Sequence, residues 1–311
     1  MQVPKNLHGF YFLLVLTTGM VACNKEAAFQ PRSEEYDLTV KDNPSDPVDH
    51  AIYQFYQTTG VPIYYNDTIA KIKVGDSAGI PQYTYQRLAL TYSPAGIGAP
   101  ISWVPLPDKK LVLPMLPLLQ DKLLPQLTNV YPVPSLFIVS SSRQRAFQGL
   151  MVGRNNKPFP GFNSLMLSNV NPAIMSDSAQ RDYIADVLGI IAYKMLRPNY
   201  DKGLVTEFDK ITASTTSYPN MYAHPLSDLS PDGNGKLEDF SFLPVRYVSG
   251  LAQGMTTTQE NDFLSYIEAV FFYNNNPSVN FETDFGAYPL IIKKFRLVQK
   301  MLKDIGFRIA D

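Results

Sequence analysis

Apolar residues at helical spacing mark one long helix near the middle of the chain, over residues 179–196. The apolar positions that recur every three or four residues are Ile184, Val187, Leu188, Ile191 and Met195. This spacing gives a helix one apolar face. Pro198 and Gly203 are predicted to end the helix, because proline lacks an amide donor and glycine favours helix ends.

Shorter apolar runs predict a small sheet and further helices. Residues 135–140 (SLFIVS) form a continuous apolar run, which is typical of a short buried strand. Further strands are predicted over 61–65, 148–152 and 164–168, and further helices over 48–58, 111–127, 259–273 and 288–302. Residues 76–93 fit neither pattern, and residues 96–107, which contain Trp103, are predicted to form a loop. The lysines and arginines of the last helix are predicted to lie on a solvated face.

The composition mainly excludes functions. Hydrophobic residues make up 45% of the 311 residues, which is enough for a substantial core. The formal net charge is −1 and no long basic run occurs, so the chain lacks the electrostatic footprint of a nucleic-acid-binding protein. The 25 prolines, 19 tyrosines and 18 phenylalanines favour a loop-rich and aromatic-rich protein of the kind found outside the cytoplasm.

The N-terminal sequence indicates export and lipidation. Lys5 precedes an apolar run at 10–16, and small residues then lead to Cys23, a pattern that resembles the lipobox of bacterial lipoproteins. The apolar run is too short to span a membrane and is predicted to be cleaved. Cys23 is the only cysteine, so it cannot form an internal disulfide, whereas a lipid anchor needs one thiol at this place. The alternative is an ordinary secretory signal with a chance cysteine.

These features predict three parts of the chain. Residues 1–22 form the signal peptide, residues 23–48 form the lipidated cysteine and a polar tether without an apolar period, and residues 49–311 form one domain. No internal repeat and no further boundary divides the last part.

The order of the elements resembles a known family. After the lipobox, the tether, the SLFIV strand and the central helix, the chain reads TEFDKIT at 206–212 and ENDFLSYIEAVF at 260–271. This order is similar to that of zinc-binding metallopeptidase lipoproteins, also described as substrate import-associated zinc metallohydrolases. The resemblance implies a single α+β domain with a zincin-like fold, in which a small mixed sheet packs on the central site helix.

The chain departs from this family at the residues that carry the chemistry. The family's helix reads HEFxHxL, and the resemblance puts Gly189, Ile190 and Tyr193 at the positions of histidine, glutamate and histidine. A later acidic position falls on Ser265. In zinc hydrolases the two histidines bind the metal and the glutamate accepts a proton from the metal-bound water. We therefore expect a degenerate, non-catalytic relative that binds no zinc.

Two other interpretations of the central helix stay open. The helix is simply a core helix, which is the usual role of an apolar stripe. Alternatively, the protein is an active zinc metallopeptidase whose ligands lie elsewhere. That interpretation requires His50, His224 and one acid to converge, since these are the only histidines after the predicted signal peptide.

The resemblance also implies a place and a partner. Members of the family are lipid-anchored at the outer membrane and act with TonB-dependent nutrient import, so the implied partners are a TonB-dependent receptor and its lipoprotein partner. The implied ligand is a glycan or a peptide. A purely structural subunit of an envelope complex is the remaining alternative, because a fold resemblance does not define a function.

One stretch resembles a calcium-binding loop. Its candidate ligands are Asp228, Ser230, Asp232, Asn234 and Asp239. Their spacing, with a glycine at the sixth position, is that of an EF-hand loop. However, Gly235 occupies a position that is normally hydrophobic, and no helix pair is predicted on the two sides. The alternative is a simple Asp-Gly-Asn-Gly turn.

Overall fold

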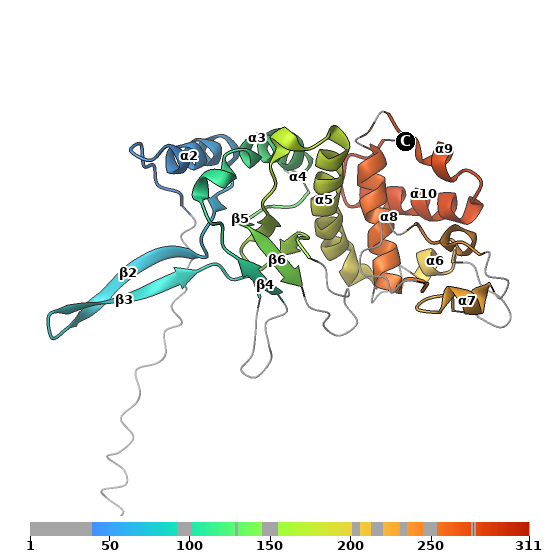
Figure 1. The fold of residues 1–311 in the computed structure, drawn as a ribbon, viewed down its shortest axis with the longest axis horizontal. Coiled ribbons are helices and arrows are strands. Elements are labelled where there is room, and N and C mark those ends of the chain that lie inside the picture. Colours follow the sequence, from blue (N-terminus) through green and yellow to red (C-terminus); the bar gives the residue numbers. More distant parts are fainter. Residues whose placement is uncertain are drawn as a thin grey trace, which may run out of the picture. The chain divides into compact units, whose positions relative to one another are not determined.

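The structure is a computed structural model in which the chain is a mixed α+β protein (Figure 1). It describes residues 39–91, 101–127, 130–144, 155–200, 206–212, 220–230, 235–244, 254–274, 276 and 278–310. The predicted signal peptide, Cys23, the predicted strand at 148–152 and the candidate calcium ligands Asp232 and Asn234 lie outside these residues.

Four short strands form a mixed sheet in the order β1-β5-β8-β7. They are β1 (Ile63–Tyr64), β5 (Leu136–Val139), β7 (Phe159–Pro160) and β8 (Leu165–Ser168). Strand β5 pairs in parallel with β1 and β8, and β7 pairs antiparallel with β8. Leu136 and Ile138 of β5 belong to the main core, whereas Phe137 and Val139 belong to a second core. A strand buried on both faces has no polar positions, which explains the continuous apolar run and confirms this predicted strand.

Two antiparallel strand pairs lie outside this sheet. Strands β2 (Thr68–Ser77) and β3 (Ile80–Arg87) form a hairpin, and β4 (Ile101–Val104) pairs with β6 (Ser141–Gln144). Ala78 and Gly79 close the hairpin, both with positive φ, as a two-residue hairpin turn requires. The predicted loop at 96–107 is wrong at β4, where Trp103 packs edge-on against Phe137 with 5.9 Å between ring centroids. Four residues with one apolar face are too short a pattern to mark a strand.

The first helix, α2 (Pro47–Thr59), has ends that the local sequence specifies. The Asp46 carboxylate accepts hydrogen bonds from two amides of the first turn, and Pro47 needs no amide partner there. Gly60 ends the helix with a φ of 71°, in the left-handed region that favours glycine. The prediction of a helix over 48–58 is confirmed.

The helical segment predicted at 111–127 consists of short pieces. They are the 3₁₀ helix η1 (Lys109–Val112), α3 (Met115–Leu118), the π-helical turn η2 (Leu119–Leu123) and α4 (Leu124–Leu127). Pro114, Pro117 and Pro125 provide no amide hydrogen, so one uninterrupted α-helical ladder cannot form. The leucines between the prolines nevertheless face the main core.

The central helix, α5 (Asp177–Tyr200), is the longest of the described helices and lies between the sheet and helix α8 (Figure 1). It continues through Pro198, because proline in the last turn disturbs only the hydrogen bond of one earlier carbonyl. The predicted single apolar face is also wrong. From Tyr183 to Tyr193 every residue except Asp186 is buried, because other elements cover the helix on all sides.

The C-terminal part is helical apart from its loops. Its elements are α6 (Thr206–Asp209), α7 (Leu226–Leu229), η4 (Leu237–Phe240), α8 (Gln259–Asn274), α9 (Phe281–Phe285) and α10 (Pro289–Asp304). A further 3₁₀ turn, η3 (Pro172–Ile174), precedes α5. The helices predicted at 259–273 and 288–302 are confirmed. Among the described residues, no helix has the length and apolarity needed to cross a membrane.

Candidate functional site

The predicted zinc positions of α5 lie at the contact between α5 and α8. A Cβ atom at Gly189 would lie 2.6 Å from Cγ of Glu268, so only glycine at this position leaves room for the Glu268 side chain where it lies. One turn later, the Tyr193 ring packs against Phe263 with 6.3 Å between ring centroids. Burial raises the pKa of Tyr193 to about 12, so its hydroxyl stays protonated at neutral pH.

The other two predicted positions are also packed in the interior. Ile190 is part of the main core, and Ser265 is 1% exposed. The Ser265 hydroxyl donates to the backbone carbonyl of Asp262 on its own helix, at 2.7 Å. Two surface hollows of about 430 and 390 Å³ occur elsewhere, and none of the four positions lines either of them.

The two histidines required by an alternative zinc site have other surroundings. His50 Nδ1 lies 2.8 Å from an oxygen of Asp42, and its other ring nitrogen lies 2.9 Å from the side-chain nitrogen of Gln54. The backbone amide of His224 donates to Thr256 Oγ1 at 2.9 Å. Within the described ranges, no three histidine, cysteine, aspartate or glutamate residues gather as a metal site would require.

The described part of the candidate calcium loop has no EF-hand geometry. Asp228 lies inside the four-residue helix α7, and Asp239 lies inside the short 3₁₀ helix η4. Ser230 Oγ accepts a hydrogen bond from the amide of Gly235 at 2.8 Å, and Asp239 accepts one from the amide of Lys236 at 2.9 Å. Calcium binding stays a prediction, and titration calorimetry of the protein with Ca²⁺ tests it.

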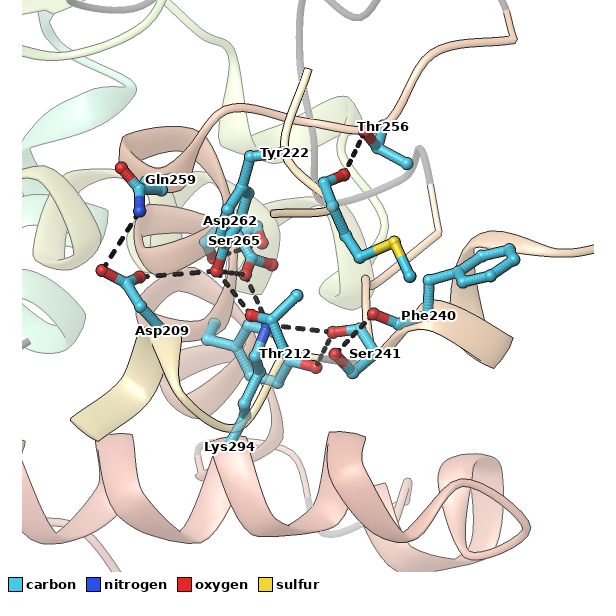
Figure 2. Close-up of polar contacts among 12 residues, drawn as sticks. Asp209, Thr212, Tyr222, Phe240, Ser241, Thr256, Gln259, Asp262, Ser265 and Lys294 are labelled. Carbon is cyan, nitrogen blue, oxygen red and sulfur yellow. Dashed lines mark hydrogen bonds and ion pairs between the residues drawn. The ribbon is translucent and has the colours of Figure 1, made fainter. Parts of the chain in front are cut away.

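The most unusual polar group in the described chain is a buried ion pair between α8 and α10 (Figure 2). Lys294 Nζ lies 2.6 Å from Asp262 Oδ2, and both side chains are 0% exposed. Lys294 also donates to the backbone carbonyl of Ser241 at 3.2 Å. Asp262 Oδ1 has no hydrogen-bond partner among the described residues. A buried charge pair must be well hydrogen-bonded to offset its desolvation, so this unpartnered oxygen is costly.

Aromatic rings surround the lysine end of this pair. The distances from Lys294 Nζ to the ring centroids are 4.7 Å for Phe208, 5.1 Å for Phe242, 5.5 Å for Tyr266 and 5.7 Å for Tyr222. A cation within about 6 Å of a ring centroid is attracted by the π electrons when it lies over the ring face. The rings come from four segments, so the ammonium group connects α10 to α6, α8 and two loops.

A second carboxylate, Asp209 of α6, forms the outer side of the cluster. Tyr222 connects it to the ion pair: the Tyr222 hydroxyl lies 3.1 Å from Asp262 Oδ2 and 3.4 Å from Asp209 Oδ1. Thr212 Oγ1 lies 2.7 Å from the same hydroxyl. A tyrosine has one hydroxyl hydrogen, so the favourable arrangement has Thr212 donating to Tyr222 and Tyr222 donating to Asp262.

The electrostatics of the cluster differ between its two acids. Burial and then the nearby charge of Asp262 raise the pKa of Asp209 to about 6. Burial also raises the pKa of Asp262, and the charge and hydrogen bond of Lys294 oppose this effect. Burial lowers the pKa of Lys294, and Asp262 opposes that effect. Asp209 is thus a group that titrates near neutral pH beside a fully buried ion pair.

This arrangement can hold helices together and bind a proton, but its centre cannot meet a solute. Asp262 and Lys294 are fully buried, whereas Asp209, Thr212 and Gln259 are only partly buried. Gln259 donates to Asp209 Oδ2 at 3.4 Å and covers it from the start of α8.

No motif in the sequence marks this cluster. Lys294 was predicted to lie on a solvated face, which is wrong, because it occupies a position of the buried stripe of α10. The stripe consists of Ile291, Lys294, Phe295, Val298 and Leu302. Lys294 falls at the helical spacing of these apolar residues, and this spacing indicates a buried position. Asp209 and Asp262 come from TEFDKIT and ENDFLS, the two segments that carry the family resemblance.

By its fold and this cluster, the chain is a mixed α+β protein with an ion pair buried in its helical C-terminal part. No protein-family model, no curated protein and no solved structure matches it.

Proposed function

We propose that this protein is a lipid-anchored, non-catalytic relative of zinc metallohydrolases with a zincin-like fold. It is anchored at the outer membrane through Cys23 and binds a substrate or partner of a TonB-dependent nutrient import system. The partners in this proposal are a TonB-dependent receptor and its companion lipoprotein, and the ligand is a glycan or a peptide.

The contact at Gly189 carries the non-catalytic part of the proposal. In a zinc hydrolase, the first turn of the motif needs an imidazole and an open volume for metal and water. Here the Glu268 side chain of α8 occupies that volume, because its Cγ atom would lie only 2.6 Å from a Cβ atom at Gly189. Tyr193 and Phe263 fill the next turn. The face of α5 that would hold the metal is thus used for helix packing.

Two further observations support a relation to the metallohydrolases. A small mixed sheet precedes the long buried helix α5, and the remaining part is helical, which is the order that the resemblance implies. In addition, the TEFDKIT and ENDFLS segments lie next to each other, because Tyr222 contacts Asp209 and Asp262. Segments that frame a site in active relatives would be neighbours in this way, and here a lysine neutralises their buried carboxylate.

Metal analysis of the full-length protein tests the central claim. The protein is purified from membranes without chelators, and its metal content is measured by mass spectrometry before and after dialysis against EDTA. We expect far less than one zinc per chain and no change of thermal stability with EDTA. One zinc per chain, removable by EDTA with a loss of stability, would show an active-type site and contradict the proposal.

Affinity purification from solubilised membranes tests the partner. We expect a TonB-dependent receptor to copurify, and we expect added glycan or peptide ligand to change its recovery. Copurification that no ligand affects would favour a structural subunit of an envelope complex.

A further inference from the structure

The hairpin β2–β3 is exposed on both faces over most of its length (Figure 1). Every residue from Lys73 to Tyr85 is exposed. A two-stranded hairpin is marginally stable by itself in water, because it has no sheet face or helix against which to bury apolar groups. An exposed ribbon of this length therefore suggests a surface that is covered by a partner.

Apolar side chains are concentrated on this hairpin. Val74 is 58% exposed, Ile80 67%, Tyr83 43% and Tyr85 52%, and these are four of the nine large apolar side chains that are exposed in the described chain. Single exposed apolar residues are ordinary, but a group of them on one element indicates an interaction site.

One face of the hairpin combines tyrosines with cations. Lys71 pairs with Tyr85 and Lys73 with Tyr83 across the strands, so all four side chains lie on the same face. Arg87 follows two residues after Tyr85 and shares that face. Lys71 Nζ lies 4.1 Å from the centroid of the Tyr83 ring and 5.9 Å from that of Tyr85. The opposite face of β3 carries Ile80 next to the turn and then the uncharged polar residues Gln82, Thr84 and Gln86.

The order of the apolar, aromatic and outermost cationic side chains along the hairpin follows the polarity gradient of a lipid surface. Ile80 lies next to the turn, Val74 and then the two tyrosines follow, and Lys71 and Arg87 lie farthest from the turn. The ion pair of Asp76 and Lys73 extends from the second residue pair after the turn to the level of Tyr83. In membranes, apolar groups enter the acyl region, tyrosines lie at the interface, and long cationic side chains reach the headgroups.

The charges on the hairpin fit an anionic partner. The hairpin carries three cations and one carboxylate, Asp76, which lies 2.8 Å from Lys73 and is neutralised by it. Lys71 and Arg87 are thereby left to face the partner, although Arg87 also lies 3.9 Å from Asp67 at the base. Each cation near an anionic membrane adds to the attraction.

We propose that the turn and the basic-aromatic face of hairpin β2–β3 dock onto anionic phospholipids of the membrane that holds the protein. The inference rests on the proposed function for the lipid anchor at Cys23. The anchor makes a weak contact effective, because docking becomes intramolecular and the local lipid concentration is high. The contact orients the domain relative to the membrane.

A fluorescent probe at the turn tests this proposal in the full lipidated protein. Cys23 is the only natural cysteine and its thiol carries the lipid, so Ile80→Cys provides a single site for an environment-sensitive dye. The matched control is Ile174→Cys, since Ile174 is 83% exposed but lies in η3. Both proteins are reconstituted into vesicles of phosphatidylcholine, with or without phosphatidylglycerol, and with acyl chains that carry a quencher.

We expect the dye at residue 80 to be quenched in vesicles with phosphatidylglycerol and the dye at residue 174 to remain in water. Lys71→Gln and Arg87→Gln in the Ile80→Cys protein should each lower the docked-to-undocked ratio about fivefold. Gln82→Ala, on the opposite face, should leave the quenching unchanged.

Equal quenching at the two positions, or no quenching at residue 80 with the protein still on the vesicles, would overturn the proposal. Quenching at residue 80 that is the same without phosphatidylglycerol would refute the role of anionic lipid. If heparin binds the hairpin in solution while the vesicle signal is absent, the partner is a soluble anionic polymer and lipid docking is wrong.

Failure of the anchor itself has a different signature. An unlipidated Cys23 would take up dye, so the Ile80→Cys protein would carry two dyes per chain. The protein would also leave the vesicles. Failure of the hairpin contact alone leaves one dye per chain and a protein that stays on the vesicles.

Discussion

Replacement of Gly189 by alanine tests whether this position serves close helix packing. Glycine in the middle of a helix is about 1 kcal/mol less favourable than alanine, so propensity alone predicts that Gly189→Ala stabilises the protein. The structure predicts the opposite sign. The new Cβ would lie 2.6 Å from Cγ of Glu268, roughly 1 Å closer than carbon atoms pack at optimal separation.

The expected magnitude follows from what must move. The same Cβ would lie 3.5 Å and 3.6 Å from Cα and Cβ of Glu268, which are ordinary contacts, so the backbones need not separate. The Cγ atom must move instead, and Glu268 is only 6% exposed, so its side chain has little room. Overpacking of this kind costs about 1–3 kcal/mol. After subtraction of the gain in helix propensity, we expect Gly189→Ala to destabilise the protein by about 1 kcal/mol.

A double-mutant cycle with Glu268→Ala isolates the contact. Removal of Cγ leaves only ordinary contacts, so in the Glu268→Ala background Gly189→Ala should stabilise the protein by about 1 kcal/mol, a coupling of about 2 kcal/mol. Urea unfolding followed by circular dichroism measures all four variants, and the midpoint and slope separate stability from changes in the unfolded state. If Gly189→Ala is stabilising in both backgrounds, the Glu268 side chain does not fill the space beside Gly189, and helix packing leaves room for a metal there.

The remaining predictions concern the ion pair, its neighbouring carboxylate and the anchor. Lys294→Met should lower the free energy of unfolding by about 3–5 kcal/mol, because it leaves a buried carboxylate without a cation, and Asp262→Asn in addition should restore part of the loss in urea unfolding. The pKa of Asp209 is raised in the folded state, so its contribution to stability is full below about pH 4 and is lost as the pH rises through about 6. A pKa of about 6 in place of the ordinary value of about 4 corresponds to about 3 kcal/mol, which solvent screening at this half-buried group reduces to about 1 kcal/mol. Asp209→Asn should therefore be more stable than the natural protein above pH 7, and equal unfolding midpoints from pH 4 to pH 8 would contradict this. Cys23→Ser should abolish metabolic labelling with palmitate, and persistent labelling would locate the lipid elsewhere.

Elements with a continuous apolar run, a regular apolar spacing or capping residues could be predicted from the local sequence. The SLFIVS strand is buried on both faces, and an apolar run is the direct consequence of such burial. Helices α8 and α10 are long enough for their spacing to show, and α2 has a capping aspartate and a terminal glycine. These features depend on neighbours in sequence, so sequence reasoning reaches them.

Neither the hairpin nor the ion pair could be predicted from a short stretch of sequence. In hairpin β2–β3, polar and apolar residues alternate only over the short stretches 71–74 and 82–86, and no apolar face is buried there to extend the pattern. Lys294 and Asp262 are 32 residues apart, and only the packing of α10 on α8 brings them together. The charge of Lys294 suggested a solvated position, whereas its place between Ile291 and Phe295 indicated burial. The spacing of apolar residues in α10 therefore predicts the burial of Lys294 better than its charge does.

The meaning of Gly189 also changes once its neighbours are known. In the proposed resemblance to zinc hydrolases, it stands at the position of a histidine. In the structure it has a role of its own, because it lets Glu268 enter the space beside α5. A helix without side chains at this position and with α8 at a greater distance would leave a cavity, and such cavities are costly. Replacing Gly189 and Tyr193 with histidine would therefore not recreate a zinc site: the imidazole at 189 would need the volume of Glu268, and α8 would have to move together with the Asp262 ion pair that it carries.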